Sequence, residues 1–152
     1  MTESRTTKSN RLFHALAICT MGVLAVLALK PSVCAADGEV YSVKLPEPVV
    51  KTDASAQSTV QILSTTGWKW NDEYPAKVSF SSEGPVSVTP DQLTKANGKI
   101  EVKDGHATLP LTLTGKSSGE GTVLMKASFS ICSEETCKVF RNKEFRFKVK
   151  VQ

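Results

Sequence analysis

Apolar and polar residues alternate with a period of two through most of the chain, and this pattern constrains the fold more than any other feature. Successive side chains of a β-strand point to opposite faces, so the alternation predicts strands with one face in a core and the other in solvent. No segment beyond the N-terminal leader shows a convincing amphipathic helical period. The alternating apolar residues include Val60, Ile62, Ala76, Val78, Phe80, Ile100, Val102, Leu109, Leu111 and Leu113.

Clusters of turn-forming residues separate these runs. They are TTG, SSEGP, KANGK, KDGH and GKSSGEG. Gly, Asn, Asp, Ser and Pro supply positive φ angles or preset turn conformations, so each cluster marks a change of direction. About seven or eight short strands at this spacing predict an all-β fold, namely an immunoglobulin-like antiparallel β-sandwich.

We expect three parts along the chain. Residues 1–35 form a signal peptide, residues 36–57 form an N-terminal edge strand and linker, and residues 58–152 form the β-sandwich domain. The middle part is set apart because its alternation does not separate apolar from polar residues cleanly and two prolines follow. The residues after the leader suffice for one hydrophobic core but not for two.

The first 35 residues have the layout of a secretory signal peptide. A basic start precedes an apolar run over about residues 16–29, and the small residues of VCAADG follow. Cleavage after Ala35 or Ala36 predicts a periplasmic or secreted protein. Two alternatives stay open, an uncleaved membrane anchor and lipidation of Cys34, and we expect membrane association only in those two cases.

Most of the net positive charge lies in this leader. The whole chain has 19 basic and 15 acidic residues, and the leader holds four of the basic ones and one acidic one. Its removal leaves 15 basic against 14 acidic residues, a net charge of about +1. A nucleic-acid partner is therefore not expected, since such binding rests on clustered positive charge.

Cys132 and Cys137 are the two thiols beyond the leader, in the stretch FSICSEETCKVF. Cys132 falls on the polar face near the end of its strand, because the odd-numbered residues from Val123 to Ile131 are apolar. The four residues SEET are a common hairpin-loop length, so the two cysteines are expected to face each other as a cross-strand disulfide.

Three interpretations of this pair stay open: a structural staple, a redox couple or a metal clip. A disulfide that closes such a short loop stabilises the fold by only about 2 kcal/mol in the chain-entropy model, which weakens the case for a pure staple. A metal site lacks partners, because His106 is the only histidine beyond the leader and nothing places it near the pair. We expect no metal and no cofactor.

A second distinctive stretch is TGWKWNDEYPAKVSF. Trp68 and Trp70 lie two residues apart and face the same way in a regular strand, and Tyr74 follows a polar turn. These three residues are either a core or rim cluster that anchors a hairpin, or a binding platform, or a lid over the cysteine pair.

A strand that ends in FSIC, a short acidic loop, ETC and a final alternating strand resemble the N-terminal domain of the DsbD thiol:disulfide interchange proteins. The resemblance implies an immunoglobulin-like fold. It also implies that Cys132 and Cys137 form a redox pair that takes electrons from a membrane protein and passes them to thioredoxin-like proteins. Two features depart from the family: four residues separate the cysteines where five are expected, and the family's aromatic cap over the pair has no counterpart here.

The expected function is therefore that of a secreted or periplasmic, non-catalytic interaction or accessory module with a DsbD-like domain. The sharper hypothesis is that this module relays thiol–disulfide exchange through Cys132 and Cys137. The alternative is a non-redox cell-envelope or ligand-binding β-sandwich with a structural disulfide. No other enzymatic activity is expected, because no Ser-His-Asp spacing, Gly-rich phosphate loop or CxxC motif is present.

Overall fold

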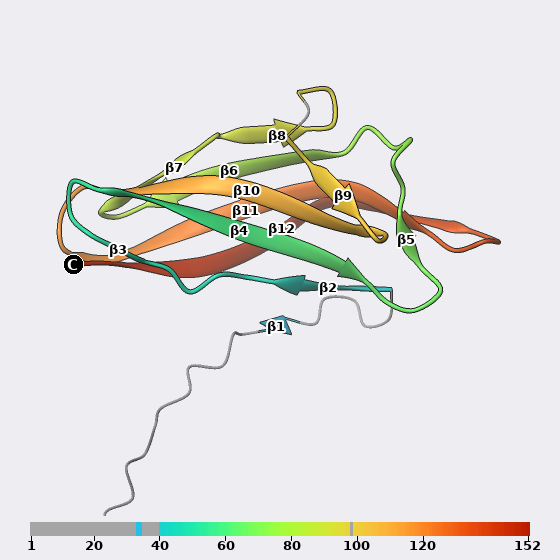
Figure 1. Ribbon diagram of the computed structural model, residues 1–152, viewed down its shortest axis with the longest axis horizontal. Helices are drawn as coiled ribbons and strands as arrows, with labels where there is room; N and C mark the ends of the chain where they lie inside the picture. The colour runs from blue at the N-terminus through green and yellow to red at the C-terminus, as the bar shows by residue number, and fades with distance from the viewer. Residues whose placement is uncertain (1–32, 35–39, 98) are drawn as a thin grey trace, which may run out of the picture.

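A computed structural model describes residues 33–34, 40–97 and 99–152, and its elements are all β-strands (Figure 1). The expected leader, its cleavage point and the modification of Cys34 lie outside the described residues, apart from the backbone of Val33 and Cys34. In the described part of the chain, no helix is long and apolar enough to cross a membrane. The strands are β1 (Val33–Cys34), β2 (Tyr41–Lys44), β3 (Val49–Val50), β4 (Ser55–Ser64), β5 (Lys69–Trp70), β6 (Lys77–Glu83), β7 (Val86–Thr89), β8 (Gln92–Thr94), β9 (Glu101–Lys103), β10 (His106–Gly115), β11 (Gly119–Cys132) and β12 (Cys137–Val151).

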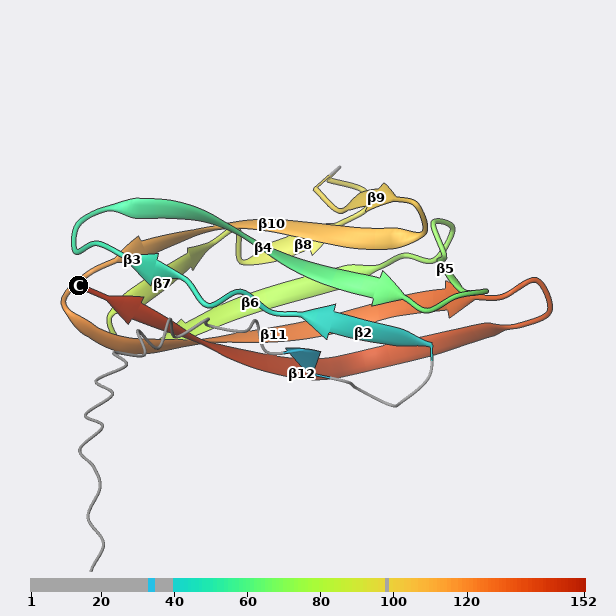
Figure 2. The same ribbon diagram turned by 60° about the horizontal axis from the view of Figure 1, so that its bottom comes forward.

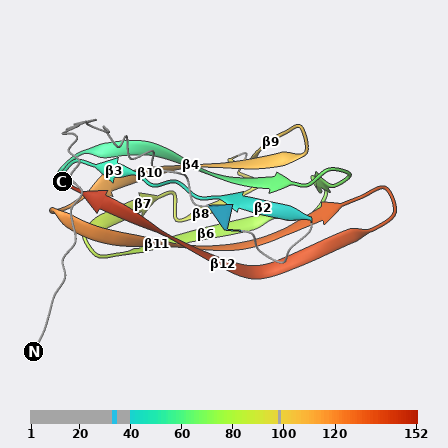
Figure 3. The same ribbon diagram turned by 90° about the horizontal axis from the view of Figure 1, so that it is seen from below.

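The strands form two stacked sheets (Figure 3). The first has the order β1-β2-β4-β10-β7, with β9 also paired to β10, and the second has the order β3-β12-β11-β6-β8, with β5 also paired to β11. The strand pairs are antiparallel except β3 with β12. The orders β2-β4-β10-β7 and β12-β11-β6 match the A-B-E-D and G-F-C sheets of an immunoglobulin domain, so the predicted fold class is confirmed.

The sandwich begins earlier in the chain than predicted. The boundary at residue 58 falls inside β4, and β2 pairs with β4 while β3 pairs with β12. Tyr41, Val43 and Val50 are buried. Residues 36–57 were expected to hold an edge strand and a linker because of Pro46 and Pro48. The prolines instead mark the point where the chain crosses from the first sheet to the second.

The core fills the space between the sheets and follows the predicted alternation. Of the residues expected to face inward, all but Ile100 and Val102 are at most 5% exposed, and these two are half-buried against the core. The strongly buried inward residues are Val60, Ile62, Ala76, Val78, Phe80, Leu109, Leu111, Leu113, Val123, Met125, Ala127, Phe129 and Ile131.

An aromatic cluster closes one end of this core, with the fully buried Phe129 at its centre. Trp70 stacks on Phe129 with a centroid distance of 5.3 Å and an interplanar angle of 9°. The ring centroids of Tyr41 and Phe140 each lie 5.1 Å from that of Phe129, and they lie 4.7 Å from each other. Because Tyr41 belongs to the first sheet and the other three rings to the second, the cluster fastens the two sheets together beneath the β11–β12 hairpin.

The two tryptophans are expected to differ in their effect on stability. Trp70→Ala should lower the free energy of unfolding by about 3–5 kcal/mol, because it empties a buried site against Phe129. Trp68→Ala should cost clearly less, because its ring is half-buried. Denaturant unfolding measures both values. A Trp70→Ala variant within about 0.5 kcal/mol of the wild type would contradict the core assignment.

Candidate functional site

The β11–β12 hairpin extends beyond the ends of the neighbouring strands (Figures 1 and 2). Its tip is a tight turn in which the Ser133 N–H donates to the carbonyl oxygen of Thr136 at 2.8 Å. The Ser133 hydroxyl oxygen accepts hydrogen bonds from the N–H groups of Glu135 and Thr136 at 3.3 and 3.2 Å. These bonds order the turn and leave Glu134 and Glu135 exposed at its tip.

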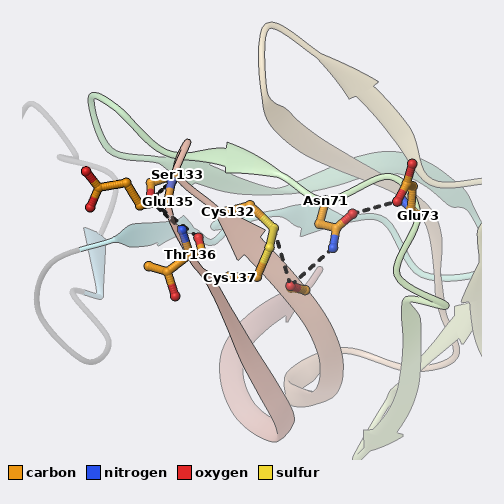
Figure 4. The surroundings of a disulfide bond; sticks show 8 residues. Asn71, Glu73, Cys132, Ser133, Glu135, Thr136 and Cys137 are labelled. Carbon is orange, nitrogen blue, oxygen red and sulfur yellow. Dashed lines mark hydrogen bonds between the residues drawn. A yellow bond between two sulfur atoms is a disulfide. The ribbon is translucent and has the colours of Figure 1, made fainter.

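The predicted disulfide lies directly behind this turn (Figure 4). Cys132 and Cys137 are register partners, their sulfur atoms are 2.04 Å apart, and their Cα atoms are 4.0 Å apart. Cys132 is half-buried and Cys137 is exposed. The cross-strand pair expected from the spacing is therefore present, and one of its sulfur-bearing residues faces solvent.

A β-bulge in β12 places both cysteines on the same face of the hairpin. The inward residues of β12 after the bulge are odd-numbered, from Phe145 to Val151, so an unbroken alternation would turn Cys137 toward the core as well. The register shifts between the pairs Ala127–Lys143 and Phe129–Phe140, which inserts one extra residue into β12. Asn142 has a positive φ of 51° at this point, and its N–H donates to the Ser128 hydroxyl oxygen at 3.0 Å.

Strand β5 flanks the disulfide on the other side. Lys69 pairs with Cys132, and Trp70 pairs with Ile131. The backbone N–H of Trp70 donates to the carbonyl oxygen of Gly105, in the turn before β10, at 2.8 Å. Strand β5 therefore links the second sheet to the first. The segment that carries Lys69 is thereby held at both of its edges.

The chain after β5 adds a polar network against the disulfide (Figure 4). The Asn71 N–H donates to the Ser130 carbonyl oxygen at 2.9 Å, and the Asn71 side-chain amide lies 3.5 Å from the Ser130 hydroxyl. That hydroxyl lies 3.9 Å from the Cys132 sulfur. The Asn71 side-chain oxygen also accepts the Glu73 N–H at 3.0 Å. Asn71 therefore positions the loop that follows it relative to the disulfide.

A groove of about 710 Å³ separates the 67–73 segment from the hairpin. Its charged lining is mostly acidic, with four carboxylates against one ammonium group. One of these carboxylates has a partner, because Asp72 lies 3.5 Å from the Lys95 ammonium group. The charged groups are Lys69, Asp72, Glu73, Glu134 and Glu135.

The three aromatic residues predicted as a site do not form an exposed platform. Trp70 belongs to the core, and its pairing with the inward Ile131 places it on the face opposite the disulfide, so it is not a lid. Trp68 is half-buried, with the Lys138 ammonium group 5.2 Å from its ring centroid. Tyr74 is half-buried and packs against the core. The structure does bring the 67–73 segment to the same end as the cysteines.

His106, the histidine considered as a metal ligand, has a different role in the structure. His106 lies in β10, where its Nδ1 accepts the Ser64 N–H at 2.9 Å, so it supports the contact between β4 and β10. Among the described residues, no three His, Cys, Asp or Glu side chains are grouped in a way that could hold a metal ion.

Sequence reasoning missed several residues that build this site: Asn71, Ser130, Phe140 and Asn142. Only Asn142 carries a usable local signal, because Asn is one of the few residues that readily adopts a left-handed backbone conformation. The others depend on tertiary contacts between segments far apart in the chain.

Comparisons with known proteins give fold-level likenesses. No family model and no curated protein matches the sequence. Among solved structures, the chain is similar to domains 4 and 5 of the S-layer protein SbsC, with 16% identity and a TM-score of 0.43 over 80% of this chain and 46% of that one. It is also similar to a CARDB domain from Pyrococcus furiosus, with 15% identity and a TM-score of 0.44 over 76% and 97%. A C. elegans MSP family member has 13% identity and a TM-score of 0.42 over 75% and 99%.

The bulge residue provides a test of how the disulfide is positioned. Asn142→Gly should leave the free energy of unfolding within about 0.5 kcal/mol, because glycine tolerates a positive φ. Asn142→Val should lower it by about 1–2 kcal/mol, because a β-branched side chain is strained there. Arg141→Val is the matched control at an exposed neighbouring position. Equal effects of valine at 141 and 142 in denaturant unfolding would contradict the assigned conformation.

Proposed function

We propose that this protein is a non-catalytic binding module of the cell envelope, which engages a partner through the disulfide-bonded hairpin and the groove beside it. The observation that carries this proposal is the groove of about 710 Å³ between the 67–73 segment and a hairpin that projects past the sandwich. Concave sites beside displayed loops are common positions for ligand binding.

The walls of the groove are ordered before any partner arrives. On one side, the turn bonds of Ser133 and the Cys132–Cys137 bridge hold the hairpin tip. On the other side, β5 is hydrogen-bonded to both sheets. Preordered walls reduce the conformational entropy lost on binding, so a modest contact area can give useful affinity.

The position of the groove suits an interaction domain of this fold. It lies between the β4–β6 connection and the β11–β12 hairpin, which correspond to the B–C and F–G connections of an immunoglobulin domain. In variable domains these two connections lie at the binding end. The acidic lining favours a partner segment that carries exposed Lys or Arg side chains.

The proposed location is outside the cytoplasm, in the periplasm or beyond it. The leader-like N-terminus supports export, and disulfides persist mainly in oxidising compartments.

Thiol–disulfide exchange is the second candidate, favoured by the exposure of Cys137. A thiolate of a reduced membrane electron-transfer protein would attack the Cys137 sulfur, and Cys132 would leave as a thiolate. The donor's second thiolate would then attack the donor's own sulfur in the mixed disulfide and release Cys137 as a thiolate. Two electrons would pass to this pair, and the donor would be left with a disulfide. The reduced pair would pass these two electrons to an oxidised thioredoxin-like protein by the same exchange, which would re-form the Cys132–Cys137 disulfide.

The binding proposal predicts site-specific crosslinking in the cell envelope. A photoreactive phenylalanine in place of Glu134 should give a defined adduct with a partner, and the same replacement at Glu101, on β9, should not. Glu73→Lys/Glu135→Lys should reduce the adduct by about tenfold or more, because it reverses charge in the groove. Glu83→Lys/Glu101→Lys is the charge-matched control. Equal adduct yields from positions 134 and 101 would argue against the groove.

The exchange candidate predicts a disulfide that is reduced more easily than a structural one. The pair should equilibrate with a thioredoxin-like protein and have a reduction potential of about −270 mV or above, whereas structural bridges typically lie below about −300 mV. Cys132→Ser/Cys137→Ser should stay folded with a loss of about 2 kcal/mol, because the closed loop is short. A potential far below −300 mV would leave the disulfide as a staple of the binding hairpin.

A further inference from the structure

The two sulfur atoms of the disulfide have different surroundings. Cys132 pairs with Lys69 of β5 on one side and with Cys137 of β12 on the other, and it is half-buried. Cys137 is exposed. The outcome of thiol–disulfide exchange depends on which sulfur an incoming thiolate can reach. Access therefore favours attack at Cys137, with Cys132 as the leaving group.

Ser130 places a hydroxyl group beside the Cys132 sulfur (Figure 4). It precedes Cys132 by two residues in β11, so both side chains lie on the same face of the strand. The Ser130 hydroxyl oxygen lies 3.9 Å from the Cys132 sulfur. Because a disulfide sulfur carries no proton, the hydroxyl is the donor of this contact and the sulfur is the acceptor.

Asn71 covers this hydroxyl and orients it. Ser130 is only 1% exposed, and a buried hydroxyl is costly unless it is hydrogen-bonded. The Asn71 side-chain amide donates to the Ser130 hydroxyl oxygen at 3.5 Å, and the Asn71 backbone N–H donates to the Ser130 carbonyl oxygen at 2.9 Å. Since the hydroxyl oxygen accepts from Asn71, its own hydrogen is left to point toward Cys132.

The charged groups around Cys132 oppose one another. Lys69, its register partner on β5, favours a thiolate at this position. Four carboxylates in the same groove disfavour a thiolate, although one of them already has an ammonium partner. Lys138 of β12 lies on the opposite face, with its ammonium group 5.2 Å from the Trp68 ring centroid. The carboxylates belong to Asp72, Glu73, Glu134 and Glu135. Charge alone therefore does not favour the thiolate, whereas a hydrogen bond from Ser130 does.

We propose that the disulfide is a one-sided thiol-exchange site, in which Ser130 stabilises the departing Cys132 thiolate and Asn71 positions the Ser130 hydroxyl. An incoming thiolate forms a bond to the Cys137 sulfur, the Cys132–Cys137 bond breaks, and its electron pair stays on the Cys132 sulfur. The hydroxyl donates a hydrogen bond to the new thiolate, and no proton is transferred. This inference rests on the exchange candidate proposed above and assigns roles to two further residues.

The side of attack can be tested on the exported protein with a small thiol. The oxidised protein is treated briefly with 2-mercaptoethanesulfonate, free thiols are blocked with N-ethylmaleimide, and both adducts are located by mass spectrometry. Cys137 should carry the small thiol and Cys132 the maleimide. The reverse arrangement, or equal amounts of the two arrangements, would overturn the proposal.

The role of the hydroxyl can be tested in a Cys137→Ser background. The pH profile of Cys132 alkylation by iodoacetamide, with the labelled peptide identified by mass spectrometry, reports the fraction of thiolate. Ser130→Ala should move the midpoint upward by about half a unit and lower the rate at neutral pH about threefold, because a hydrogen bond to the thiolate is lost. Ser128→Ala is the matched control, since it removes a hydroxyl of the same strand that bonds to Asn142, and it should leave the midpoint unchanged. Equal midpoints for the two variants would overturn the proposal.

Failure of this inference is distinguishable from failure of the exchange function. A strongly reducing potential of the native pair would defeat the function without changing the alkylation midpoints or the side of attack. Asn71→Ala gives a second readout should Ser130→Ala fail to fold, because it keeps the Ser130 hydroxyl and the backbone bond between the two residues. It should move the midpoint in the same direction by a smaller amount, and an unchanged midpoint would contradict the positioning role of Asn71.

Discussion

The packing of Phe129 against three other aromatic rings is the contact on which the hairpin end of the molecule depends. Phe129 is fully buried, and its neighbours Trp70, Tyr41 and Phe140 come from β5, β2 and β12. Each ring fixes a different element at the same place. Trp70 positions the wall of the acidic groove, Phe140 positions the base of the hairpin, and Tyr41 ties both to the first sheet.

Acidic and basic side chains lie on different parts of the structure. Residues 36–152 together are close to neutral, yet acidic side chains gather at the hairpin tip and the adjacent groove, while basic side chains follow β12. Within the core-facing layer, the same strands carry almost only apolar residues. One pair of strands therefore supplies the core, an acidic end and a basic edge, which lets a small domain present two surfaces of opposite sign.

The alternation of apolar residues predicted most of the core, because burial on one face of a strand leaves a direct mark on the sequence. It predicted the inward faces of β4, β6, β10 and β11 and the outward position of Cys132. It failed for Tyr41, Val43 and Val50, which lie in strands too short to show a period. The prolines between them resemble a linker, although they serve a crossing between sheets.

For the candidate site, sequence spacing was enough to pair the cysteines because hairpin pairing is local. It could not separate Trp68 from Trp70, since their different burial is set by Phe129 and Lys138, which are distant in the chain. The face of Cys137 also depends on the bulge. It cannot be derived by counting back from Phe145, because the register shifts by one residue on the way.

Because of that register shift, an insertion or deletion of an odd number of residues in β12 has a different effect from one of an even number. Loss of one residue between Phe140 and Phe145 would cancel the shift, so the tip segment would have to turn over or slide relative to β11. A two-residue change preserves the faces and alters only the length of the strand. In related chains that keep the disulfide on the outer face, the length of this segment should therefore vary in steps of two residues. The segment lengths of such chains would then indicate whether their hairpins contain the same bulge.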